Sequence, residues 1–475
     1  MMVLAKAILL LIPGFASLAQ AGMHPVQLAC SAIQESLGSH IVNTAPLNQT
    51  LVRINWSATC IAEPRCIVQP TAPEHISETL QIIGRHKVKF AVRSGGHSPN
   101  PGAASIHDGI LIDMSKFNEV SVSEDALVVT VGTGSRWGKV AEVLEPHNVS
   151  IVGARAPVVG VGGSLLGGGY SYFSGQYGLA VDNIKNCEVI QCICNVDETD
   201  EIGFTDPALK GGGPNFGIIT KCDLFTVPIN GVWYHGLLYL PDKAHQILNA
   251  FATWQKEGAL DVKSNIALSI GLDQIIVVFT YAAPITDTSV FGCFEGIESL
   301  LEAIPRTNGT LHSLNHHDYR AVSSKIDNQL YIDMYDFWLE RATLARHVAN
   351  VNQTFAIQHV SRNVARAGLD KGGNPLGLPE EDHQWWTCLV DWEHESDDDL
   401  ARSASIKTTD KWQEMAAQRN LAMPLLYMND ASRDQNPIAS YGSENMSKLK
   451  AIALKYDPQA MFQRFQNGGF LLSRT

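Results

Sequence analysis

The chain has 475 residues, of which 45% are hydrophobic and 17% charged, and this composition excludes an intrinsically disordered protein. The length allows two domains with ample core. Its formal net charge of −13 argues against a nucleic-acid partner, which requires a basic face. After the N-terminus no run reaches the roughly 20 apolar residues of a membrane span, so we expect no membrane partner either.

The first 21 residues have the order of a secretory signal peptide. Lys6 precedes the apolar run that begins with Ala7 to Ile12, and Ala19-Gln20-Ala21 matches the small-x-small cleavage pattern. The alternative is a short buried helix. We therefore expect a secreted glycoprotein. Sequons stand at Asn48, Asn55, Asn148, Asn308, Asn352 and Asn445.

Nine cysteines leave at least one unpaired if all pairing is internal. We expect one disulfide among Cys30, Cys60 and Cys66, close to the mature N-terminus. Cys187, Cys192 and Cys194 match no standard zinc spacing, and secretion favours disulfides or buried thiols for them. We expect no metal site.

Periodicity predicts mixed helices and strands with short connections and no repeat. Residues 22–59 form a helix-and-loop lead-in. From Cys66 onward the sequence shows regular strand and helix patterns. The predicted strands are 67–70, 88–92, 110–113, 119–122, 127–131 and 149–152, and the predicted helices are 72–86 and 135–145.

A glycine-rich turn follows the strand at 88–92. It consists of Arg93, Ser94, Gly95, Gly96, His97 and Ser98. Two consecutive residues without a Cβ let backbone N–H groups approach a phosphate closely, and the imidazole at the rim can act as base, ligand or nucleophile. The alternative is an ordinary β-turn with a surface histidine.

Two further glycine-rich stretches, 159–170 and 209–219, follow in the chain. The first is only loosely similar to a dinucleotide fingerprint, because Gly160-Val161-Gly162 lacks the final glycine and no βαβ unit surrounds it. A nicotinamide site is therefore not expected. Three such turns separated by strands indicate one large ligand.

The second half of the chain is less informative. The polar loops at 315–318 and 392–395 carry histidines and carboxylates, which are solvated more often than metal-bound. Asp397 to Asp399 indicate a helix start, where the helix dipole favours acidic residues. Trp385-Trp386 indicates core or interface packing.

Taken together, three motifs give a resemblance to a known family. R-S-G-G-H-S, G-V-G-G-x-x-x-G-G-G and L-K-G-G-G-P-N-F-G-I-I-T resemble the FAD-binding half of the vanillyl-alcohol oxidase superfamily, in particular the berberine-bridge-enzyme-like oxidoreductases. The C-terminal sequence, which contains Tyr427-Met428-Asn429 and Gly468-Gly469-Phe470, resembles the last segment of proteins in that family.

The resemblance implies an α+β fold. A two-subdomain PCMH-type FAD-binding domain would span 60–230, and a substrate domain with an antiparallel sheet backed by helices would span 231–420. Residues 421–475 would return to the FAD domain.

FAD is the implied cofactor, joined covalently to His97. Many relatives add a second bond from a cysteine, but the corresponding position here is Ala156, so we expect one covalent bond. A histidyl link raises the flavin potential and prevents loss of the cofactor. The implied cofactor-binding residues are Arg93, Ser94, Gly95, Gly96, His97, Ser98, Gly160, Gly162, Gly163, Gly167, Gly168, Gly169, Gly211, Gly212, Asn215, Gly217 and Ile218.

Tyr427 is the predicted catalytic base or substrate-orienting group, with Asn429 beside it on a strand facing the same way. The alternative is a core aromatic with a bonded hydroxyl. Many relatives carry a second Tyr directly after the Asn, where this chain has Asp430. Asp430 and Tyr441 are the fallback bases.

A second departure spans 190–208, where an acidic, Cys-bearing segment replaces the apolar strand and turn usual in the family. It is either a real variation or a mistranslated exon boundary.

Three functions remain in view. The first is a secreted FAD-dependent oxidase that takes a hydride from an alcohol, amine or related biosynthetic intermediate, its partners being a small organic substrate and molecular oxygen. The second is a carbohydrate oxidase on the same scaffold. The third is a non-catalytic flavin-binding remnant.

Overall fold

The computed structural model describes residues 24–191, 210–229, 231–284, 287–309 and 318–475. The expected signal peptide at 1–21, the loop at 315–317 and most of the 190–208 segment lie outside the described residues. No helix within the described ranges is long and apolar enough to cross a bilayer.

The first sheet has the order β1-β2-β4-β3, and β2, β3 and β4 run parallel. The helices packed around it bury isoleucines and leucines at helical spacing, such as Ile76, Leu80 and Ile83. Its elements are β1 (Val42–Asn43), β2 (Cys66–Val68), β3 (Phe90–Arg93), β4 (Ile110–Asp113), α2 (Pro25–Leu37), α3 (Gln49–Val52) and α4 (Pro73–His86).

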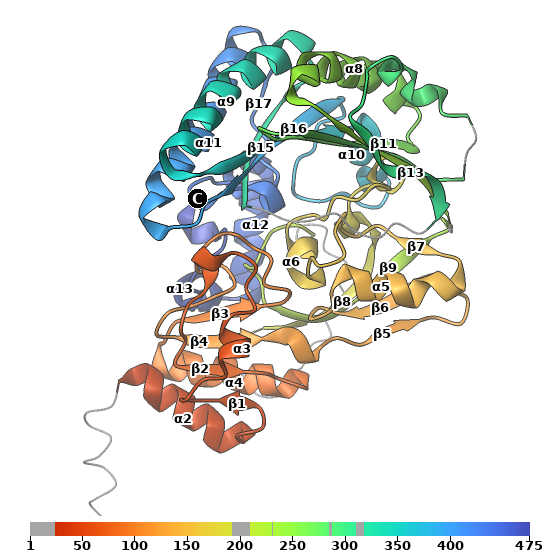
Figure 1. Cartoon of the computed structure of the whole chain (residues 1–475). Helices are drawn as coiled ribbons and strands as arrows, with labels where there is room; N and C mark the ends of the chain where they lie inside the picture. The colour runs from red at the N-terminus through yellow and green to blue at the C-terminus, as the bar shows by residue number, and fades with distance from the viewer. Residues whose placement is uncertain (1–23, 192–209, 230, 285–286, 310–317) are drawn as a thin grey trace, which may run out of the picture.

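The second sheet has the order β5-β6-β9-β7, with β8 also paired to β9. These antiparallel strands and the helices beside them carry the second and third glycine-rich stretches (Figure 1). Its elements are β5 (Val120–Val122), β6 (Val128–Gly132), β7 (Ser150–Ile151), β8 (Ile184–Ile190), β9 (Ile218–Val227), α5 (Trp137–Leu144), α6 (Val161–Leu166) and α7 (Ser174–Tyr177).

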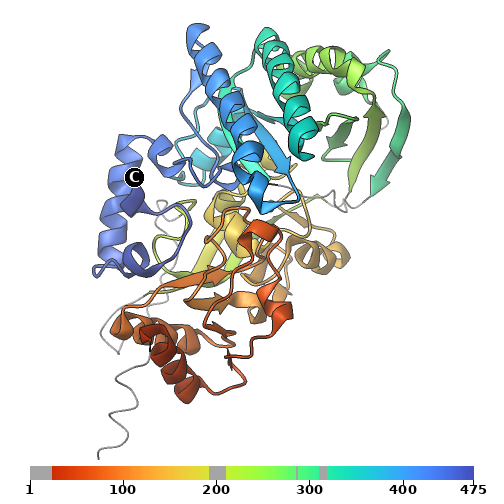
Figure 2. The same cartoon turned by 60° about the vertical axis from the view of Figure 1, so that its left-hand side comes forward.

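The third sheet is antiparallel, with the order β13-β10-β12-β11-β15-β16-β14-β17. Helices α8, α9 and α11 cover its outer face, and α9 and α11 lie side by side there (Figures 1 and 2). Its strands are β10 (Val232–Tyr239), β11 (Ser264–Ile270), β12 (Ile275–Tyr281), β13 (Leu301–Gly309), β14 (Asp318–Lys325), β15 (Asn352–Val360), β16 (His383–Asp391) and β17 (Ala422–Met423). The helices are α8 (Ala244–Lys256), α9 (Asn328–Ala349), α10 (Arg362–Leu369) and α11 (Asp398–Gln418).

The C-terminal segment returns to the first sheet. Helix α13 (Met461–Phe465) packs in the core of the first sheet, and Phe90 forms a parallel bridge to Gln466 (Figure 1). Helix α12 (Ser443–Tyr456) instead buries Leu449 and Ala453 in the core of the second sheet. The α+β class, with an antiparallel sheet backed by helices, is therefore confirmed. The expected helix start at Asp398 and the burial of Trp385 and Trp386 are confirmed as well.

Two disulfides lie within the described residues. Cys30–Cys66 joins α2 to β2 and confirms the expected N-terminal disulfide. Cys187–Cys222 joins β8 to β9 at directly paired positions, which the sequence analysis left open between a disulfide and buried thiols. Cys60 instead donates its thiol to the Ser98 carbonyl, at 3.4 Å.

Candidate functional site

A cavity of about 460 Å³ lies between the glycine-rich turns and the inner face of the third sheet. Such a volume is typical of a small-molecule or cofactor site. Of the residues expected to bind the cofactor, those that line it are Ser94, Gly95, Gly96, His97, Ser98, Gly160, Gly162, Gly163, Gly167, Gly169, Gly217 and Ile218. The three stretches therefore meet at one place.

Close backbone contact holds the first two stretches together. A Cβ on Gly95 would lie 2.5 Å from the Gly160 Cα, so neither position accepts a larger residue without a backbone shift. Arg93 is not among the described lining residues. It is buried beneath the turn, where its guanidinium donates to Asp113 and to the Asn55 side chain at 3.1 Å.

The second glycine-rich stretch leaves empty space at the cavity surface. Gly163 on α6 is exposed to the cavity, and a Cβ added there would meet no atom within 4 Å. Gly167 instead packs on the Asn429 side chain, and Gly168, outside the described lining, packs on the Tyr427 ring.

The third stretch is partly structural. Asn215 is fully buried, donates to the Gly212 carbonyl at 2.7 Å and to the Phe470 carbonyl at 3.0 Å, and accepts from the Leu472 N–H. It thereby fastens the C-terminal segment to this turn. Gly211, Gly212 and Asn215 do not appear among the described lining residues.

The third sheet closes the cavity with small and polar side chains. Because side chains alternate along a strand, the large apolar residues Phe355 and Trp386 face the helices. Ala356 and Thr387, which directly follow them, line the cavity. The inward positions of β11, β15 and β16 that line it are Ala267, Ser269, Ala356, Gln358, Thr387 and Leu389.

Tyr427 and Asn429 lie together in the cavity wall, but not on a strand as predicted. Tyr427 caps a short 3₁₀ helix over Met428–Asp430, which places the Asn429 amide 3.0 Å from the Tyr427 hydroxyl. The prediction of a strand was wrong because a tight turn brings these side chains together as well as strand alternation does. The Tyr427 ring stacks on Trp385 at 4.3 Å, and burial raises the pKa of Tyr427 well above its usual value.

Asp430 is the acidic group of this wall. Its Oδ2 accepts from the Gln358 amide at 2.7 Å and from the Thr387 hydroxyl at 3.0 Å. Burial raises the pKa of this carboxyl, and the positive charge of Arg155, another lining residue, opposes the rise. Tyr441, the other fallback base, donates to the Gly211 carbonyl at 3.1 Å and is absent from the described lining.

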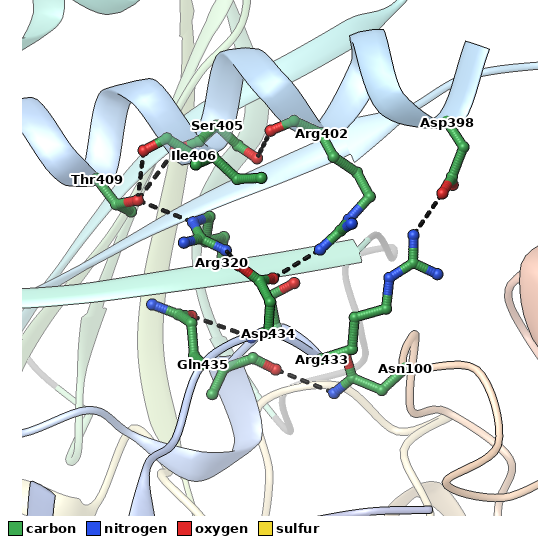
Figure 3. Close-up of polar contacts among 12 residues, drawn as sticks. Asn100, Arg320, Asp398, Arg402, Ser405, Ile406, Thr409, Arg433, Asp434 and Gln435 are labelled. Atoms are coloured by element: carbon green, nitrogen blue, oxygen red, sulfur yellow. Dashed lines mark hydrogen bonds and ion pairs between the residues drawn. The ribbon is translucent and has the colours of Figure 1, made fainter.

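Charged contacts brace the segment that carries these residues. Asp434 accepts from Arg320 on β14 at 2.7 Å and from Arg402 on α11 at 2.6 Å (Figure 3). Asn100, three residues after His97, donates to the Ala431 carbonyl at 3.0 Å. The wall is therefore tied to the third sheet and to the His97 turn at once.

Sequence reasoning missed Gln358, Thr387 and Arg155. The first two are polar residues on strands that carry other polar residues as well, so they can be singled out only when the inward face of the sheet is known. Arg155 adjoins Ala156, which does line the cavity where many relatives place a second flavin-linking cysteine.

The residues fit an FAD cofactor. The open space beside Gly163 is a cradle that any side chain would fill, and it belongs to the same cavity that the His97 turn and Asp430 line. The Gln358 Oε1 is buried without a hydrogen-bond partner in the described part of the chain, so the wall offers a polar atom to a ligand. No three His, Cys, Asp or Glu side chains in the described ranges gather as a metal site.

Comparisons agree with this fit. Residues 64–193 match the FAD binding domain family. An FAD-dependent monooxygenase of Arthrobotrys oligospora is 33% identical over 94% of this chain and 90% of its own length. The solved structure of BBE-like 1 of Physcomitrella patens has a TM-score of 0.71 at 18% identity, over 90% of this chain and 96% of that one. A glucooligosaccharide oxidase of Acremonium strictum has a TM-score of 0.72 at 16% identity, over 93% and 98%.

The fold and cavity define a flavoprotein with a PCMH-type FAD-binding domain. The chain belongs to the berberine-bridge-enzyme-like oxidoreductases of the vanillyl-alcohol oxidase superfamily, and it is an FAD-dependent oxidoreductase. The family resemblance inferred from the three glycine motifs is thereby confirmed.

Proposed function

We propose that the chain is a secreted oxidase that carries FAD on His97 alone and removes a hydride from a compact alcohol, amine or related biosynthetic intermediate. Dioxygen would take up the electrons. The observation that carries the proposal is one cavity that both His97 and Asp430 line. Ala156 in its wall supports one covalent bond, since alanine has no nucleophile to form a second.

Bound FAD supplies the two-electron acceptor for hydride removal. His97, Gly95, Gly163 and Ile218 would hold it. The backbone of the glycine turns would approach its phosphates and ring, where a side chain would stand in the way.

In this proposal Tyr427 and Asn429 orient the substrate, and Asp430 accepts its proton. The raised pKa keeps the Tyr427 phenol protonated near neutral pH, which suits a hydrogen-bond donor better than a base. Both hydrogen bonds that we describe at the Asp430 carboxylate end on Oδ2, so Oδ1 is the oxygen proposed to receive the proton.

The wall supports a compact substrate over a sugar chain. Sugar-binding sites commonly offer an exposed aromatic face, whereas Trp385 and Trp386 are 0% exposed. The small side chains of Ala267 and Ala356 in the cavity lining support a compact substrate above the proposed flavin site. A carbohydrate oxidase stays the second candidate, because one solved structure of similar fold is a glucooligosaccharide oxidase.

Secretion is supported by the sequence of the first 21 residues and by the two disulfides, which persist in oxidising compartments. Asn148 and Asn352 are exposed and are proposed glycan sites. Asn55 is buried and bonded to Arg93, so its sequon is proposed to stay unmodified.

The test begins with the cofactor. The protein is expressed in a secreting host and denatured in acid, and flavin fluorescence is read on the washed protein band beside His97→Ala. The exposed His147→Ala serves as the matched control. Fluorescence lost only in His97→Ala is expected. Flavin released freely from the wild-type protein would refute the covalent link.

The second step is a substrate screen. Benzylic alcohols, secondary amines and xylobiose are offered, and hydrogen peroxide is counted per substrate consumed. Turnover of an alcohol or amine with one peroxide each is expected. Turnover of xylobiose alone would favour the carbohydrate oxidase, and oxygen incorporated into product without peroxide would replace the oxidase with a monooxygenase.

A further inference from the structure

The Trp56 side chain stacks against His97, the histidine to which the flavin is proposed to attach. The indole and the His97 imidazole are stacked, with ring centroids 4.9 Å apart and planes 3° from parallel. His97 lines the cavity, whereas Trp56 is not among the described lining residues. The indole therefore lies behind the imidazole and leaves the ring accessible from the cavity.

The segment that carries Trp56 is hydrogen-bonded to and packed against the His97 turn. The backbone N–H of Trp56 donates to the Gly96 carbonyl at 3.0 Å, and the side-chain amide of the buried Asn55 donates to the Ala104 carbonyl at 3.3 Å. Gly96 has a φ of 66°, and a Cβ there would lie 3.4 Å from the Asn55 Cα. The Arg93 guanidinium joins Asn55 to Asp113 in the core. Loop 55–56 and the His97 turn are thus one packed unit.

We propose that Trp56 is a positioning residue for covalent flavin attachment at His97. Attachment forms one bond between an imidazole nitrogen and the flavin 8α-carbon, while a methyl C–H and the imidazole N–H bond are lost. The two protons and two electrons released reduce one dioxygen to hydrogen peroxide, so atoms and electrons balance. The inference rests on the proposed covalent link and names the residue that makes it efficient.

Two physical effects give Trp56 this role. An unsupported imidazole rotates about two side-chain bonds, and stacking on a fixed indole confines it to one plane, which favours a productive encounter. The electron-rich indole face also stabilises positive charge that develops on the imidazole as its nitrogen forms the new bond.

The experiment measures attachment separately from binding. Wild-type protein, Trp56→Ala, Trp56→Phe and His97→Ala are incubated aerobically with FAD, and band fluorescence is followed in time beside total bound flavin. Trp392→Ala, which removes a half-buried indole packed in the other core, is the matched control. Melting temperatures report whether each variant is folded.

Trp56→Ala should bind FAD but attach it about threefold to tenfold more slowly, the range expected for one aromatic pair. Trp56→Phe, which keeps a flat ring, should recover most of the rate, and Trp392→Ala should match wild type. Attachment at the wild-type rate in Trp56→Ala would overturn the inference and leave the proposed link intact. So would loss of total FAD with no change in the attached fraction, or a Trp56→Phe as slow as Trp56→Ala. Absence of covalent flavin from the wild type would overturn both.

Discussion

Two glycines in the cavity wall predict opposite effects of the same added methyl group. Gly163→Ala places a Cβ where no atom lies within 4 Å, in the open space assigned to the flavin. Alanine in a helix is about 0.5–1 kcal/mol more favourable than glycine, so the folded chain should not lose stability. The same methyl group would occupy the cofactor's space, and the flavin bound per chain should fall severalfold.

Gly95→Ala is the matched control, with its Cβ 2.5 Å from the Gly160 Cα. Carbon atoms pack about 3.5–4.0 Å apart, so the two backbones must separate by roughly 1 Å. Overpacking of this kind costs about 1–3 kcal/mol. The free energy of unfolding, measured in urea on the flavin-free fraction of each variant, should therefore fall for Gly95→Ala and not for Gly163→Ala. Full flavin content in Gly163→Ala would refute this placement of the cofactor, and an unchanged Gly95→Ala would refute the backbone contact.

Three further outcomes are expected. If Asp430 is the base, the rate of oxidation of a substrate found in the screen should rise with pH through the raised pKa of this carboxyl, since only the ionised form accepts a proton. The Asp430→Asn variant should lose that rise and about 10²–10⁴-fold in turnover. A pH profile that is unchanged in this variant would exclude the role. Arg93→Ala should cost about 3–5 kcal/mol in urea unfolding, because Asp113 stays buried without its partner; a loss below about 1 kcal/mol would contradict the structure. Replacing Cys187 and Cys222 together by alanine should cost about 2–4 kcal/mol, given their separation of 35 residues, and an unshifted urea midpoint would argue against the disulfide.

The sequence predicted the site best where the backbone itself forms the wall. Glycine motifs report that something approaches the main chain, and the turn at 95–98 and the stretch at 160–169 do line one cavity. The same motifs also contain glycines needed only for packing. Gly168 packs on Tyr427 and Gly212 packs on Phe216, a distinction that requires three-dimensional neighbours. Arg93 likewise belongs to a glycine motif but points into the core.

The opposite wall could not be predicted, because it depends on which face of a long strand is turned inward. Gln358 and Thr387 stand 29 residues apart in sequence, yet their side chains meet at 3.0 Å because β15 and β16 are paired. Strand periodicity identifies alternate faces without saying which one meets the flavin domain. The Tyr427 to Asp430 turn was misread as a strand for a related reason, since a single 3₁₀ turn leaves no periodic pattern.

The departure at 190–208 bears on the cavity through its two ends. β8 and β9 are paired through Ile190 and Ile218, and the Cys187–Cys222 disulfide closes the same ladder three residues before Ile190. Gly217 and Ile218, which line the cavity, are therefore positioned by strand pairing and a covalent bond at the base of the segment. Both residues belong to the part of the chain that the structure describes. The strands at the two ends of the segment therefore keep the cavity wall that the glycine motif predicts, and the relationship to FAD-dependent oxidoreductases argues against a non-catalytic remnant.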